Sequence, residues 1–276
     1  MIFFSFNEEI KAIKVRKDFV AVVMKTKIRV YKIIDPRLAS GILFCSEITN
    51  LCNLNSKNVD VMNKNNNESL MVICPDWNTN ESIRIWTVSD RKTDLTNWTV
   101  KAHNSSVNCV SFNSDASLVA TSSVKGTIIR IFNSRASKTH ELRRGLLQCA
   151  TIKQLVFSID SQFLACLSNL NTIHIFRLNR QSEENSWFST NTLIGVANVL
   201  TYGVSNYLCL QRSFATVSLS RELSGDIKVH GFVKGHNSDA LGLVLSVQTR
   251  YLKVFLLDTK NGGQCDEKTK FEIVPT

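Results

Sequence analysis

The sequence predicts an all-β protein with the fold of a β-propeller, and two features of the chain support this prediction. Apolar and polar residues alternate in short strand-like stretches, whereas helical periodicity is absent throughout. The closing aromatic residues of a recurring tetrad are 55, 46, 44 and 79 positions apart. A unit of roughly 40–45 residues with about four short strands is typical of one propeller blade. The tetrad reads aliphatic, basic, aliphatic, aromatic and occurs at Ile28–Tyr31, Ile83–Trp86, Ile129–Phe132, Ile173–Phe176 and Leu252–Phe255.

Three strands are expected at the start of the chain, over residues 10–15, 19–24 and 27–34. With the five tetrads they predict five blades in a single domain over 1–276. A propeller must close on itself because an unpaired edge strand is a liability. We therefore expect that an N-terminal blade is missing from this sequence, through a true absence or a truncated gene model.

Two segments explain the repeat spacings that exceed a normal blade. Residues 50–69 are polar and rich in asparagine, which predicts a surface loop. The 79-residue gap is expected to contain a longer insertion over 178–211. Elsewhere the repeat is tight, because residues 112–115 return 45 positions later as residues 157–160.

The composition favours acidic partners. Lys and Arg number 33 against 23 Asp and Glu, a net charge of +10, which suits an anionic membrane, a nucleic acid or an acidic protein surface. No apolar run approaches the roughly 18–20 residues that a membrane span needs. RNA binding has no support beyond this charge, because aromatic residues are not interleaved with the basic ones.

The sequence indicates neither an enzyme nor a metal site. Asp115 and Asp160 occupy equivalent turn positions, so they are not a catalytic pair. No nucleophile constellation or phosphate-cradling glycine loop is present. The eight cysteines include no Cys-x-x-Cys pair, and most lie in apolar runs, which predicts reduced thiols in the cytosol and no cofactor.

The sequence Leu142-Arg143-Arg144-Gly145 is unusual in a chain of strands. Neighbouring side chains of a strand leave on opposite faces, so the two arginines predict two anion sites side by side. The guanidinium group is a permanently charged fork suited to phosphate. The alternative is a pair of solvated arginines at a strand end.

These residues resemble the PROPPINs, seven-bladed WD-repeat propellers that bind phosphoinositides. The similarity rests on Ala102-His103, on residues 120–127, on the tetrad Ile129–Phe132 and on residues 141–145. It extends over about 260 residues, from Phe6 to Cys265. The family signature is Phe/Leu-Arg-Arg-Gly, and the Leu form resembles the branch that contains the autophagy proteins of the WIPI and Atg18 type.

The resemblance implies two headgroup sites at the propeller rim, for phosphatidylinositol 3-phosphate and phosphatidylinositol 3,5-bisphosphate. Hydroxyl, lysine and arginine groups supply the hydrogen-bond donors that phosphate oxygens require. The first site takes six residues of this chain: His103, Ser122, Ser123, Lys125, Thr127 and Arg143. The second takes four: Arg144, Ser168, Thr172 and His174.

Several of these residues have a structural alternative. His103 is either a ligand or the histidine that braces its own blade. Ser122 and Ser123 can hydrogen-bond turn backbone instead. His174 stands where the other tetrads carry Arg or Lys, which favours an outward strand position. Gln148 is the only polar candidate after Gly145, which weakens the second site.

In the family, a long loop at the place of 178–211 contacts the bilayer. Here the corresponding segment carries Trp187, Phe188, Leu193 and Ile194, which an exposed loop does not need for its own structure. Their burial contributes about 25 cal/mol per Å² of apolar surface removed from water. The alternative is a core strand over residues 193–200.

The resemblance thus implies a monomeric, cytoplasmic peripheral membrane protein on pre-autophagosomal or endosomal and vacuolar membranes. It reads 3-phosphorylated phosphoinositides in autophagosome formation and recruits an autophagy partner, an Atg2-like lipid-transfer protein. The alternative function is a WD-repeat scaffold that binds proteins and no lipid.

Overall fold

The computed structural model describes residues 5–34, 42–49, 51, 54–63, 69–89, 96–145, 148–170, 172–178, 210–219, 227–234, 240–247 and 251–272. These ranges form 22 strands in five sheets and contain no helix. The all-β propeller prediction is confirmed. Within the same ranges no helix is long and apolar enough to cross a membrane.

Each sheet is one antiparallel blade, and the first two are simple meanders of four strands. The first contains β1 (Ile10–Arg16), β2 (Phe19–Met24), β3 (Ile28–Ile33) and β4 (Ile42–Ile48). The second contains β5 (Asp60–Asn63), β6 (Ser69–Pro75), β7 (Ser82–Ser89) and β8 (Thr96–Lys101).

The third and fourth blades each gain a short parallel strand at the outer edge. The third contains β9 (Val107–Phe112), β10 (Leu118–Ser123), β11 (Ile128–Asn133), β12 (Lys138–Arg143) and the added β16 (Gln211–Arg212). The fourth contains β13 (Ile152–Phe157), β14 (Phe163–Ser168), β15 (Thr172–Arg177), β17 (Ala215–Ser218) and the added β21 (Gly263–Gln264). The fifth contains β18 (Ile227–Lys234), β19 (Ala240–Val247), β20 (Tyr251–Asp258) and β22 (Asp266–Glu272).

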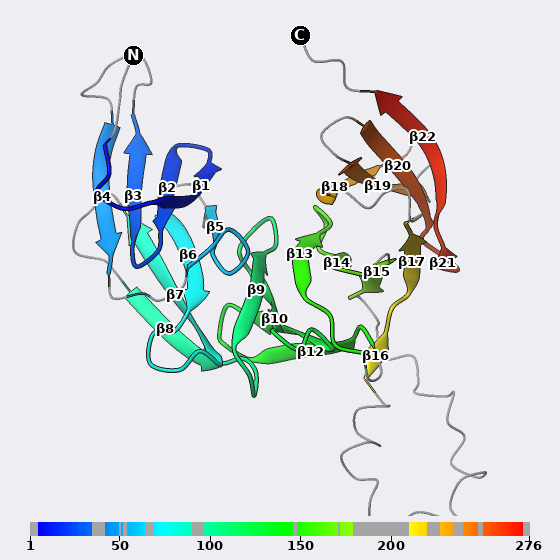
Figure 1. Cartoon of the computed structure of the whole chain (residues 1–276), viewed down its shortest axis with the longest axis horizontal. Helices are drawn as coiled ribbons and strands as arrows, with labels where there is room; N and C mark the ends of the chain where they lie inside the picture. The colour runs from blue at the N-terminus through cyan, green and yellow to red at the C-terminus, as the bar shows by residue number, and fades with distance from the viewer. Residues whose placement is uncertain are drawn as a thin grey trace, which may run out of the picture.

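The five blades follow one another around an arc, and the first strand of each blade lies on the inner side (Figure 1). Four apolar clusters fill the spaces between successive blades. Ile129 and Ile131 of β11 pack toward the fourth blade, whereas Phe132 packs toward the second. The alternation of the tetrad therefore supplies a core residue to both neighbours of a blade.

Side-chain hydrogen bonds join the inner strands of neighbouring blades. The Asp60 carboxylate accepts from the backbone N–H of Phe112 at 2.9 Å, which links the second blade to the third. Asn108 donates to the carbonyl of Ile152 at 2.8 Å. Gln154 accepts from the N–H of Val229 at 2.9 Å and donates to its carbonyl at 2.7 Å. These polar contacts hold the blades in register at the inner side of the arc.

The two predicted insertions are shorter than their expected bounds. Residues 60–63 form β5, with Val61 fully buried, so the predicted loop 50–69 is wrong for that stretch. The run Val59–Met62 is mostly apolar and completes the second blade, which outweighs its asparagine-rich surroundings. Leu178 is buried and Gln211 belongs to β16, so both ends of 178–211 are part of the propeller. Residues 179–209 lie outside the described residues.

Candidate functional site

His103 braces the third blade. Its Nε2 lies 2.9 Å from Oγ1 of Thr121, whose hydroxyl donates to the carbonyl of Arg130 at 3.2 Å. Because that hydroxyl has one proton, His103 is the donor in its own bond. Burial, with a smaller contribution from the Arg130 charge, lowers the pKa of His103 to about 4. The neutral imidazole of His103 is therefore used in the hydrogen bond to Thr121. This favours a role as a brace of the third blade over a role as a phosphate ligand.

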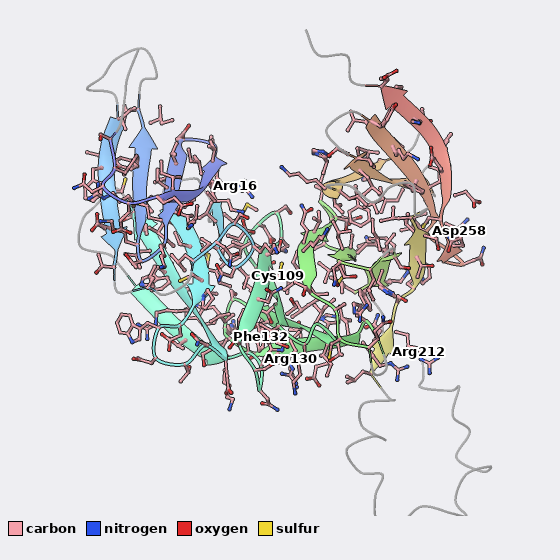
Figure 2. The ribbon with its side chains drawn as sticks, viewed as in Figure 1. Arg16, Cys109, Arg130, Phe132, Arg212 and Asp258 are labelled. Atoms are coloured by element: carbon pink, nitrogen blue, oxygen red, sulfur yellow. The ribbon has the colours of Figure 1, made fainter. Side chains whose placement is uncertain are left out.

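Arg130 completes this network (Figure 2). It donates from Nη1 to the carbonyl of Ala102 at 2.9 Å and pairs with Glu141 at 2.6 Å. Both contacts lie on the face of the third blade that packs against the second. Thr121 and Ser123 share this face by strand alternation.

Arg143 and Arg144 leave the end of β12 on opposite sides. Leu142 belongs to the apolar cluster between the third and fourth blades, so Arg143 faces the second blade. The side chain of Arg144 points toward the fourth blade, where its charge acts on His174. The exposed fraction is 4% for Arg143 and 7% for Arg144, so neither is a solvated arginine at a strand end.

Backbone carbonyls fix the guanidinium group of Arg144. Its Nε donates to the carbonyl of Gly126 at 2.9 Å, and Nη2 donates to that of Gln148 at 2.5 Å. Among the described residues, no carboxylate forms an ion pair with Arg144. Three of its five N–H donors remain after these two bonds. Gln148 therefore contributes through its backbone, by orienting the arginine.

The three other residues of the second predicted site lie on the blade face that Arg144 approaches. His174 is the register partner of Cys166, which packs between the third and fourth blades. Ser168 and Thr172 follow on the same face by alternation. Burial and the charge of Arg144 lower the pKa of His174 to about 4. The predicted outward position of His174 is wrong, because His174 lies on the side of β15 that faces the third blade, and its Nδ1 is 3.3 Å from Oγ of Ser213.

The first predicted site is brought together only in part. Ser123 lies on the same side as Arg143, and Lys125 is exposed on the turn that leads to Thr127. Ser122 pairs with Cys109 and Ile129, so it faces the fourth blade instead. Its buried hydroxyl has no hydrogen-bond partner among the residues that the structure describes. Its assignment beside Arg143 was therefore wrong, because neighbouring residues of β10 alternate between faces.

Arg212 is a basic rim residue that sequence reasoning missed. The parallel pairing of β16 with β12 places Arg212, which is labelled in Figure 2, in register with Arg143. Register partners share a face, so an exposed guanidinium group lies next to the buried one. Gln211 holds the strand by donating to the carbonyl of Arg177 at 2.5 Å. The strands β12 and β16 are far apart in the sequence, so no local sequence pattern predicts that they pair.

The chain that carries these arginines matches a known family. The sequence profile of the PROPPINs matches residues 1–271. The chain belongs to the PROPPIN family. It is 28% identical over 271 residues to WD repeat domain phosphoinositide-interacting protein 1 of Homo sapiens, which covers 95% of this chain and 57% of the relative. It is 25% identical over 234 residues to Autophagy-related protein 18 of Caenorhabditis elegans, which covers 78% of this chain and 52% of the relative. The PROPPIN chain thus spans just over half the length of these two relatives.

A solved structure supports the same fold. The structure of Kluyveromyces lactis Hsv2 superposes with a TM-score of 0.70 at 19% identity, which covers 98% of this PROPPIN and 76% of Hsv2. The predicted membrane-contacting residues Trp187, Phe188, Leu193 and Ile194 lie outside the described residues.

Proposed function

We propose that this protein is a peripheral membrane effector that binds phosphatidylinositol 3-phosphate and phosphatidylinositol 3,5-bisphosphate. The observation that supports it is the placement of Arg143 and Arg144 on opposite sides of one rim strand, each facing a different neighbouring blade. Each side then offers one guanidinium group and several hydroxyl donors to one phosphorylated headgroup.

The second site is preorganised by the backbone around Arg144. The carbonyls of Gly126 and Gln148 hold Arg144 before any ligand arrives. Less conformational entropy is then lost when its remaining donors meet a phosphate. Hydrogen bonds to charged groups contribute roughly 1.5–3 kcal/mol each, so one fixed arginine can dominate the affinity of a site. Ser168, Thr172 and the neutral His174 line the facing blade.

The first site combines Arg143 and Arg212 with Ser123, Lys125 and Thr127. Two register-paired arginines concentrate positive charge at one rim position. Because Arg212 is exposed, its charge mainly attracts the phosphate of the headgroup. Its guanidinium group can also add hydrogen bonds to the phosphate that Arg143 contacts. His103 acts here as a brace that fixes the blade.

Membrane attachment requires more than one contact. The apolar residues Trp187, Phe188, Leu193 and Ile194 would enter the bilayer interface, and each nearby Lys or Arg contributes on the order of 1 kcal/mol at an anionic leaflet. Two headgroup sites and one loop act together through effective concentration. The net charge of +10 favours the same surface.

The cellular role that we propose is recruitment in autophagosome formation. Its support is the similarity to the Caenorhabditis elegans relative, which is an autophagy-related protein. The proposed partner is an Atg2-like lipid-transfer protein, and the proposed location is the cytoplasm, on pre-autophagosomal, endosomal or vacuolar membranes.

Liposome flotation tests the lipid proposal. Wild-type protein should float with vesicles that contain phosphatidylinositol 3-phosphate and should stay at the bottom with vesicles that lack phosphoinositides. The variant R143T/R144T should lose flotation while keeping its circular dichroism spectrum. Unchanged flotation of a folded double variant would reject the proposal.

A protein scaffold without lipid binding is the second candidate. The burial of both arginines favours it, because buried guanidinium groups can serve blade packing alone. It predicts that wild-type protein ignores phosphoinositide vesicles at every composition, while R143T/R144T unfolds or loses protein partners.

A further inference from the structure

The inner side of the arc lines an open cavity of about 890 Å³ with a strongly basic wall. Its lining comes from the first strands β1, β5, β9, β13 and β18 and from the turns beside them. It is distinct from the rim, because neither Arg143 nor Arg144 contributes to it. Among the described residues, six Lys and Arg side chains line the cavity against one carboxylate, Asp60: Lys11, Lys14, Arg16, Lys57, Lys153 and Lys228.

The single carboxylate is already engaged. One oxygen of Asp60 accepts from the backbone N–H of Phe112 at 2.9 Å, and the other lies 3.6 Å from Arg16. Lys11 pairs with Glu9 at 2.5 Å, and Lys14 donates to the carbonyl of Ser56 at 3.0 Å.

Three further lysines of the described wall form no ion pair. Within the described part of the chain, no carboxylate pairs with Lys57, Lys153 or Lys228. They come from the second, fourth and fifth blades, so their charges face the cavity from different parts of the arc. Like charges around one cavity repel each other unless an anion occupies it.

We infer that this cavity is a binding site for a compact polyphosphate, such as an inositol polyphosphate. The volume lies in the range of about 300–1,000 Å³ that small-molecule sites occupy. Lysine ammonium groups are mobile point charges with three donors each, which suits an anion that carries phosphate on several sides.

The wall argues against two other anions. An acidic peptide would bind best by pairing with a strand edge, but Asn108, Gln154 and Asp60 already bridge these edges from blade to blade. A nucleotide would need a stacking surface, but Phe112 and Phe157 of the described lining are buried, and the His230 ring already contacts the Ser246 hydroxyl at 2.8 Å. The wall therefore suits a ligand that carries several phosphate groups and no nucleobase.

Isothermal titration with inositol hexakisphosphate tests the inference. Wild-type protein should bind it, and K153A/K228A should bind at least about tenfold more weakly, since 1.4 kcal/mol of lost contact is tenfold in affinity. K25A/K268A removes two exposed lysines outside the cavity and should match wild type. R143T/R144T should also keep this binding, which separates the cavity from the proposed lipid sites.

Thermal melting with the same ligand shows whether each variant folds. A ligand that binds the native state raises Tm, so inositol hexakisphosphate should raise the Tm of wild type and raise that of K153A/K228A much less. Equal affinity in K153A/K228A and wild type would overturn the inference, and so would loss of binding in R143T/R144T alone. Tighter binding of poly-glutamate than of inositol hexakisphosphate, lost in K153A/K228A, would replace the polyphosphate with an acidic peptide.

Discussion

Arg143 and Arg212 are register partners across the parallel strands β12 and β16, although 68 positions separate them in the chain. One is buried and the other exposed on the same face of the third blade. The pairing turns a local Arg-Arg motif into a cluster of three arginines at the rim. Arg143 and Arg212 serve the first site, and Arg144 serves the second.

The first prediction concerns Arg212. Arg212→Ala should weaken binding to vesicles with phosphatidylinositol 3-phosphate by roughly three- to tenfold, because one charge-assisted contact is lost at an exposed position. Sedimentation at several salt concentrations measures the effect, which should shrink at high salt. Arg135→Ala, an exposed arginine at the opposite end of β12, is the matched control. Equal binding by both variants would remove Arg212 from the site.

The second prediction concerns Gly126, whose carbonyl orients Arg144. Its φ is +59°, and a Cβ there would stand 1.8 Å from the carbonyl oxygen of Ala150. Gly126→Ala should therefore lower the free energy of unfolding by roughly 2 kcal/mol or more. At Gly145 a Cβ would meet its nearest atom at 3.4 Å, so Gly145→Ala should change stability far less. Urea denaturation of both variants compares them, and equal stabilities would contradict the packing around Arg144.

The third prediction concerns pH. The folded protein holds the pKa of His103 at about 4, below its ordinary value of 6.5. The unfolded chain then binds the proton first as pH falls, so stability is complete above pH 6.5 and declines toward pH 4. The loss from this one group is at most about 3 kcal/mol. His174 contributes in the same direction.

Denaturant unfolding between pH 7.5 and pH 4.5 measures this slope. His103→Gln keeps a donor for Thr121 and removes the titration, so its stability should depend less on pH than that of wild type. An identical slope in both proteins would show that His103 is not held neutral in the fold.

The sequence was informative wherever alternation decides the structure. The five tetrads predicted the five blades, because period two fixes which residue faces which neighbour. The same rule predicted that Arg143 and Arg144 diverge. Ser122 was misplaced because it was grouped with Ser123 by motif and not by strand face, and the outward position expected for His174 came from comparing tetrads alone. Arg212 and the basic cavity were beyond prediction, since both arise from contacts between distant segments.

The count of headgroups per protein tests the central claim most directly. Titration of short-chain, water-soluble phosphatidylinositol 3-phosphate into wild-type protein should give two sites per chain. R143T and R144T, tested singly, should each give one, and the site that persists should keep its wild-type affinity. A single site in wild type, or the loss of both sites in either variant, would contradict the assignment of one arginine to each headgroup.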